Sequence, residues 1–271
     1  MDAGLGAGLP VAGDTRTNAG KNRRLAVPAA LVLVAFGSVI VVTWVVTVLT
    51  ANDLMTLLGE EVSGAAPIGH LAYFSLAAVM MTAMMLPSAV PMVTVYQRLA
   101  RTDSTPREGN VRAALFTVTY LTVWALFAAL VLILVMELGL MGGLAGWLVL
   151  VPGGILVAAG VYQFTTWKRY CLERCQSPVG FLISRWRPGR PGSVRLGFSH
   201  AVFCLGCCWL LMLVVFVTGA MSLLWMGVFS GLVLVEKVWG STVWFTRGMG
   251  IGALSVGVWV SALALGVTTL P

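Results

Sequence analysis

The segment HAVFCLGCCWLLM, residues 200–212, is apolar enough to cross a membrane and also carries several side chains that could bind a metal. An α-helix advances about 100° around its axis per residue. Relative to Cys204, the other donor side chains of the segment fall between about −60° and +80°. Five soft or borderline ligands therefore share one face of the predicted helix: His200, Cys204, Cys207, Cys208 and Met212.

The same residues have a simpler interpretation as packing. Free cysteine behaves as a small hydrophobic residue and is often buried, so three cysteines in an apolar helix need not have a chemical role. Their common face, with His200 and Met212 on either side, weighs against packing alone. Thiolate and thioether ligands suit copper(I) or zinc better than hard cations. The sequence thus favours copper, with zinc as the alternative.

The composition of the whole chain indicates an all-α membrane protein. Of its 271 residues, 59% are hydrophobic and only 10% are charged, and long uncharged apolar stretches are typical of membrane helices. Five cysteines are too few and too poorly placed for a secreted disulfide scaffold. The first apolar run is longer than the core of a signal peptide and lacks a clear cleavage site, so we expect no cleaved leader.

We divide the chain into a disordered cytoplasmic tail, residues 1–26, and a helical transmembrane domain, residues 27–271. The tail is rich in Gly and Ala and ends in a basic cluster. The domain has apolar segments near or above the length of about 20 residues that a membrane helix needs. We predict about seven such helices, at residues 27–50, 68–98, 111–138, 144–168, 196–218, 221–240 and 247–269. Pro87 and Pro91 should kink the second.

The basic residues predict the orientation of this domain. All 17 Lys and Arg residues lie in the tail and in three links, within 98–112, 168–195 and 237–247. In a seven-span protein these four regions fall on one side of the membrane. Because cytoplasmic loops carry an excess of Lys and Arg, the N-terminus is expected in the cytoplasm and Pro271 outside. Basic flanks of this kind fix topology, so the net charge of +7 does not indicate nucleic-acid binding.

Three further features could contribute to a metal site. Cys171 and Cys175 are four residues apart and would share a helix face at the cytoplasmic mouth. Met84 belongs to the methionine-rich stretch MMTAMMLP, residues 80–87, although methionine is also a common core filler. Glu236 would lie within the sixth span, where a carboxylate is costly without a partner or cavity. Lys237 points about 100° away from it on a helix and is a poor partner, and the other basic residues are expected near the surface.

Several of these stretches occur together in a known family. They are MMTAMMLP at 80–87, KRYCLERCQSP at 168–178, CLGCCWLLM at 204–212, GAMSLLWM at 219–226 and the pair Glu236–Lys237. The chain resembles a bacterial domain-of-unknown-function family described as predicted metal-binding integral membrane proteins. The resemblance implies a polytopic membrane fold and a metal site, and it supplies no reaction.

These observations favour a multi-pass protein of the inner (cytoplasmic) membrane that handles a soft metal, by transport, storage or insertion into another protein. Cys204, Cys207 and Cys208 would form the central site, with Met84, Met212, His200 and Glu236 as auxiliary ligands or gates. Cys171 and Cys175 would exchange metal with a cytoplasmic donor, and membrane-complex subunits are further candidate partners. Two alternatives remain: a membrane-bound metal-dependent oxidoreductase, for which no catalytic motif is apparent, and a structural subunit without metal.

Overall fold

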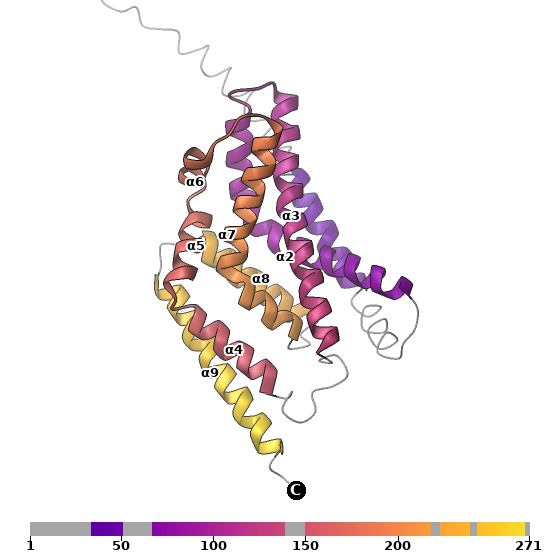
Figure 1. Ribbon diagram of the computed structural model, residues 1–271, viewed down its shortest axis with the longest axis vertical. Coiled ribbons are helices and arrows are strands. Elements are labelled where there is room, and N and C mark those ends of the chain that lie inside the picture. The colour runs from indigo at the N-terminus through magenta and orange to yellow at the C-terminus, as the bar shows by residue number, and fades with distance from the viewer. Residues whose placement is uncertain (1–33, 51–66, 139–149, 218–222, 239–242, 269–271) are drawn as a thin grey trace, which may run out of the picture.

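The computed structural model describes residues 34–50, 67–138, 150–217, 223–238 and 243–268. Within these residues the regular secondary structure is entirely helical (Figure 1). A helix at residues 34–50 precedes the labelled ones. The labelled helices are α2 (Pro67–Ala100), α3 (Pro106–Glu137), α4 (Val151–Tyr162), α5 (Thr166–Gln176), α6 (Pro178–Arg185), α7 (Gly189–Val217), α8 (Leu223–Val238) and α9 (Val243–Thr268). The predicted disordered tail, residues 1–26, lies outside the described residues.

Helices α2, α3 and α7 form the centre of the protein, with α3 in contact with both of the others. Close contact between α3 and α7 depends on a glycine: a Cβ at Gly197 would lie 2.5 Å from the carbonyl oxygen of Phe116. Aromatic side chains fill the interior beside this contact, and Tyr96, Phe116, Tyr120 and Trp124 are all fully buried. The same core contains the cysteines and methionines that the sequence analysis selected.

Helix α2 is continuous through Pro87 and Pro91. The carbonyl group that Pro87 leaves free is bound by a side chain from the helix at 34–50. Pro87 has no N–H to donate to the carbonyl of Ala83, four residues earlier. The indole Nε1 of Trp44 donates to that carbonyl oxygen instead, at 3.1 Å. Because a side chain from another helix satisfies the freed carbonyl, Pro87 is tolerated in the middle of a 34-residue helix.

Four helical stretches in the described chain are long and apolar enough to cross a membrane: Phe74–Ala100, Pro106–Val135, Gly189–Phe216 and Val243–Gly266. Two shorter apolar helices, Val34–Thr50 and Val151–Tyr162, accompany them. The predicted count of about seven spans is therefore not confirmed. The predicted continuous span at 144–168 is wrong, because α4 ends at Tyr162 and α5 starts at Thr166. The side chain of Thr165 accepts a hydrogen bond from the backbone N–H of Lys168 and so caps a new helix.

Helices α4 and α9 lie side by side and pack through glycines (Figure 1). A Cβ at Gly257 would be 2.7 Å from the backbone nitrogen of Val157. A Cβ at Gly160 would be 2.8 Å from the backbone nitrogen of Leu254. Small residues at these positions allow the two backbones to approach closely, as in many membrane helix pairs.

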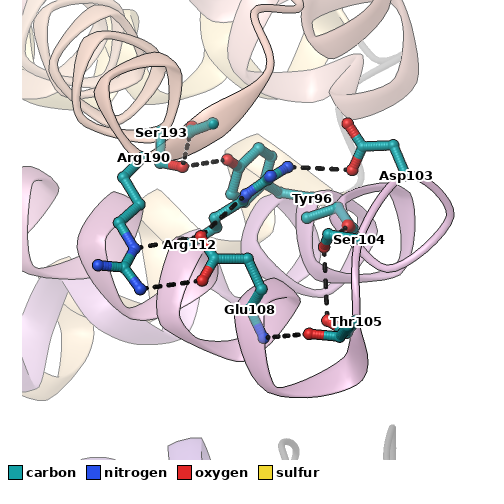
Figure 2. Close-up of polar contacts among 10 residues, drawn as sticks. Tyr96, Asp103, Ser104, Thr105, Glu108, Arg112, Arg190 and Ser193 are labelled. Atoms are coloured by element: carbon teal, nitrogen blue, oxygen red, sulfur yellow. Dashed lines mark hydrogen bonds and ion pairs between the residues drawn. The ribbon is translucent and has the colours of Figure 1, made fainter.

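The link between α2 and α3 and the start of α7 lie at the same end of the protein (Figure 2). Arg190 of α7 donates from Nε and Nη2 to the carboxylate of Glu108 on α3, at 3.1 and 3.0 Å. Arg112 pairs with Asp103 in the link at 3.0 Å. The hydroxyl of Tyr96 donates to Ser193 at 2.7 Å in the buried region beneath these ion pairs. Two of the basic regions identified in the sequence are thus brought together.

Candidate metal centre

Four cysteine thiols from two helices meet in the core. Cys204, Cys207 and Cys208 are fully buried on α7, on one face as predicted. The thiols of Cys207 and Cys208 each donate to the carbonyl oxygen of Cys204, at 3.0 Å. Cys175 comes from α5, which packs against α7, and it lies in the same buried core close to Cys204 and Cys207. We call Cys175, Cys204, Cys207 and Cys208 the thiol cluster.

The fifth cysteine, Cys171, lies at the edge of the thiol cluster, one helical turn before Cys175 on α5. Cys171 is buried, and a Cβ at Gly206 would lie only 2.7 Å from its Sγ. Because Gly206 has no side chain, the Cys171 thiol can pack directly against α7. Burial raises the pKa of the Cys171 thiol, and the nearby Cys207 acts in the same direction. Cys171 and Cys175 therefore pack against α7 beside its cysteines.

A lysine that the sequence analysis discounted reaches the thiol cluster. Nζ of Lys237, on α8, lies 2.8 Å from Sγ of Cys204 and 3.0 Å from Oγ of Ser88. The hydroxyl of Tyr120 on α3 is 3.1 Å from the same Sγ. An ammonium group and a phenol beside one sulfur favour its thiolate form, because charge-assisted hydrogen bonds are stronger than neutral ones. Cys204 is accordingly the best-supported anionic ligand of the group.

His200 lies one turn before Cys204 on α7 and is surrounded by aromatic rings. The ring centroids of Phe116, Tyr120 and Phe181 are 5.8, 5.4 and 5.7 Å from that of the imidazole. Nδ1 of His200 is buried and has no hydrogen-bond partner among the described residues. A buried nitrogen without a partner is costly, so this atom is the one feature of His200 that supports a ligand role.

The predicted thioether ligands lie in the same core as the thiol cluster. Met84 on α2 and Met212 on α7 are fully buried within it. The carbonyl oxygen of Met84 also accepts a hydrogen bond from Ser230 of α8, which holds α2 against α8. Their burial agrees equally with ligation and with packing, so both residues remain candidates.

Glu236 has a basic partner, contrary to the expectation that no lysine or arginine could reach it. Nζ of Lys168 on α5 is 2.8 Å from Oε1 of Glu236, and the side chains are only 1% and 2% exposed. Thr246 of α9 donates to the same oxygen at 3.1 Å, and Gln176 donates to the backbone carbonyl of Glu236 at 2.9 Å. This carboxylate therefore holds α5, α8 and α9 together through contacts that a structural ion pair explains without a metal.

The donor set fits a soft metal, but the side chains do not already surround a common point. No group of three or more His, Cys, Asp or Glu side chains in the described part of the chain is arranged as a ready metal site. The thiols of Cys207 and Cys208 instead both donate to the backbone carbonyl oxygen of Cys204. Binding an ion would require the coordinating thiols to lose their protons and to turn toward one centre.

Comparison with protein families identifies the chain. A family model described as PpoB2, copper chaperone, matches residues 74–260, which is more than half of the sequence. The chain belongs to the PpoB2 copper chaperone family. The matched region contains the thiol cluster, Cys171, Met84, Met212, His200 and the pair Glu236–Lys237. No curated protein and no solved structure matches the chain.

Membership in a copper chaperone family supports a copper-related function and gives no support to zinc. The sequence analysis missed three residues beside the candidate site: Lys168, Tyr120 and Ser88. Lys168, Cys171 and Cys175 are spaced i, i+3 and i+7, which places them on one helix face. That spacing was a usable signal for a buried face of α5. The contacts of Tyr120 and Ser88 with the cluster had no comparable signal, because each depends on how separate helices pack.

Proposed function

We propose that this protein is an integral-membrane copper chaperone that holds copper(I) at the thiol cluster and passes it to another membrane protein. The observation that carries the proposal is the convergence of Cys175 of α5 with Cys204, Cys207 and Cys208 of α7 in a closed core. Copper(I) is the soft cation that such sulfur ligands prefer. The four long apolar helices support a membrane location, for which the inner membrane is our proposal.

Cys204, Cys207 and Cys208 would supply the principal ligands, with Cys175 as the exchangeable one. Cys175 is the most exposed of the four cysteine residues, at 9%, and it comes from a separate short helix. An ion exchanged between proteins moves by stepwise replacement of one sulfur ligand by another. A thiol at the edge of the cluster is the natural first contact for a cytoplasmic donor, and Cys171 lies next to it on α5.

Lys237 would balance the charge of the loaded site. Copper(I) bound by two thiolates and one neutral thiol from the three principal ligands carries a net charge of −1, and an uncompensated buried charge is strongly unfavourable. The ammonium group of Lys237, 2.8 Å from Cys204, would make the assembly neutral. It would therefore act from outside the coordination shell, as the partners of metal ligands commonly do. Met84, Met212 and His200 remain candidate auxiliary ligands of the same ion.

The test is anaerobic titration of the full-length protein in lipid nanodiscs with copper(I), in competition with a chromophoric copper(I) chelator. Replacing Cys204, Cys207 and Cys208 together by Ser should abolish stoichiometric binding. The matched control is Ala201→Ser, which adds a hydroxyl to a buried position of the same helix without removing a thiol. Both variants should elute as the parent does in size-exclusion chromatography. Retention of one tightly bound copper by the triple variant would overturn the proposed site.

Lys237 gives a second and more specific readout. Lys237→Met should weaken copper(I) binding by about 10–100-fold, the range typical for loss of an outer-shell partner. Lys237→Arg keeps the charge and should restore much of the affinity. Equal affinities for the parent and the Met variant would show that the ammonium group does not balance the charge of the site.

A further inference from the structure

A cavity of about 180 Å³ lies beside the α4–α5 break, and none of the four cysteines of the thiol cluster lines it. Its walls come from the break itself, from the outer side of α5 and from the start of α9. The packing there is tight, because a Cβ at Gly250 of α9 would be 2.7 Å from the ring of Phe164. The cavity is thus bounded by well-packed segments rather than by a loose loop.

The charged side chains that line the cavity favour an anion. Arg169 of α5 and Arg247 of α9 contribute two guanidinium groups, and Glu173 contributes one carboxylate. Arg169 and Glu173 are 3.8 Å apart with both side chains 65% exposed, so their pairing is weak. The lining keeps a net positive charge and presents guanidinium groups, which suit phosphate recognition.

A buried amide gives a second and independent indication of a ligand. Gln163 lines the cavity and is 5% exposed, and its Oε1 has no hydrogen-bond partner among the described residues. A buried acceptor without a partner costs free energy. It can be satisfied by a group that donates a hydrogen bond, such as a water molecule or the hydroxyl of a bound ligand. The ligand should therefore combine a phosphate with a hydroxyl donor.

The surroundings of the cavity are those of a membrane interface. Phe164, Trp167 and Trp244 are 49%, 65% and 77% exposed at or beside its lining. Exposed Trp residues are enriched at the level of lipid headgroups. From this level α4 and α9 extend with apolar side chains on their outer faces, among them Val161, Ile251 and Val258. A headgroup in the cavity could therefore keep its acyl chains along these two helices.

We propose that this cavity binds the phosphoglycerol headgroup of an anionic phospholipid. Arg247 and Arg169 would contact the phosphodiester, and a glycerol hydroxyl would donate to Gln163. The inference rests on the membrane location in the proposed function. The cavity also adjoins the helix that carries Lys237: Thr246 lines it and donates to Glu236, the residue before Lys237. Occupancy would therefore lie next to the contact between the start of α9 and α8.

The experiment uses the full-length protein in nanodiscs that contain phosphatidylglycerol and phosphatidylcholine, followed by release into mild detergent and native mass spectrometry. The parent should retain phosphatidylglycerol in preference to phosphatidylcholine. Arg247→Gln should lower that retention at least about tenfold, the loss expected for one charge-assisted hydrogen bond. Arg195→Gln, at an exposed arginine of α7 that does not line the cavity, is the matched control and should behave as the parent.

Glu173→Gln tests the same site by a substitution that should increase lipid retention. Removing this carboxylate frees Arg169 and should increase phosphatidylglycerol retention. Equal retention of the two lipids by the parent, or equal loss in the Arg247 and Arg195 variants, would overturn the site. Displacement of the lipid by millimolar glycerol 3-phosphate would instead assign the cavity to a soluble phosphate ester and overturn the lipid assignment. Copper(I) binding is measured in parallel, and the Arg247 variant should bind copper(I) as the parent does. A failure of the lipid proposal can therefore be distinguished from a failure of the copper proposal.

Discussion

Replacing Glu236 by Gln should destabilise the protein strongly while leaving its affinity for copper(I) nearly unchanged. Glu236 and Lys168 are 2.8 Å apart, and both side chains are almost inaccessible to solvent. At that distance and an effective dielectric constant of about 20, their attraction is roughly 6 kcal/mol. Much of it offsets the cost of removing two charges from water. The Gln variant leaves Lys168 buried without its counter-ion, so we expect a loss of about 3–5 kcal/mol.

The assay is reversible unfolding in mixed detergent micelles by titration with a denaturing detergent, monitored by tryptophan fluorescence. Lys168→Met should cost a similar amount, because it leaves the carboxylate unpaired. The double variant Lys168→Met, Glu236→Met should recover most of the loss, since replacing both charges by apolar groups removes the unpaired ion. The control is Glu173→Gln, which breaks an exposed pair and should change stability by less than about 1 kcal/mol.

The reasoning would be refuted by one combination of results. If Glu236→Gln keeps the stability of the parent and instead weakens copper(I) binding, Glu236 is a ligand and its contact with Lys168 is incidental. A double variant no more stable than either single variant would likewise show that the two charges are not energetically coupled.

Three further predictions concern the topology, the site and the packing. A reporter that works only in the cytoplasm should be active when fused after Ser104, and a reporter that works only outside should be active when fused at Pro271. The reverse result would show that the predicted orientation is wrong. Tyr120→Phe removes the phenol hydroxyl beside Cys204 and should weaken copper(I) binding about fivefold, which corresponds to one hydrogen bond of about 1 kcal/mol. The circular dichroism spectrum of this variant should match that of the parent. Gly257→Leu should force α4 from α9 and destabilise by about 1–3 kcal/mol in the unfolding assay, whereas Gly252→Leu, at an open position, should be nearly neutral.

The sequence predicted the helices that carry a continuous apolar pattern and the face that carries the ligands. Cys204, Cys207 and Cys208 share a helix face because spacing alone determines their directions. The break after Tyr162 was missed because the mean hydropathy of a long segment hides four polar or aromatic residues, Gln–Phe–Thr–Thr. Thr165 is nevertheless a residue type that commonly caps helix N-termini. The pairing of Lys168 with Glu236 spans 68 residues. Such a contact depends on which helices pack together, and no local pattern contains that information.

The adjacency of Glu236 and Lys237 has a consequence for the proposed release of copper. The two side chains anchor the last turn of α8 in two directions, one to α5 and the other to α2 and α7. A rotation or slide of α8 large enough to open the core would strain both anchors at once. The scaffold is in this sense clamped at the point where its cargo is held. Handover should therefore run by ligand exchange within a stationary frame, at a rate set by how easily an acceptor's sulfur reaches the thiols.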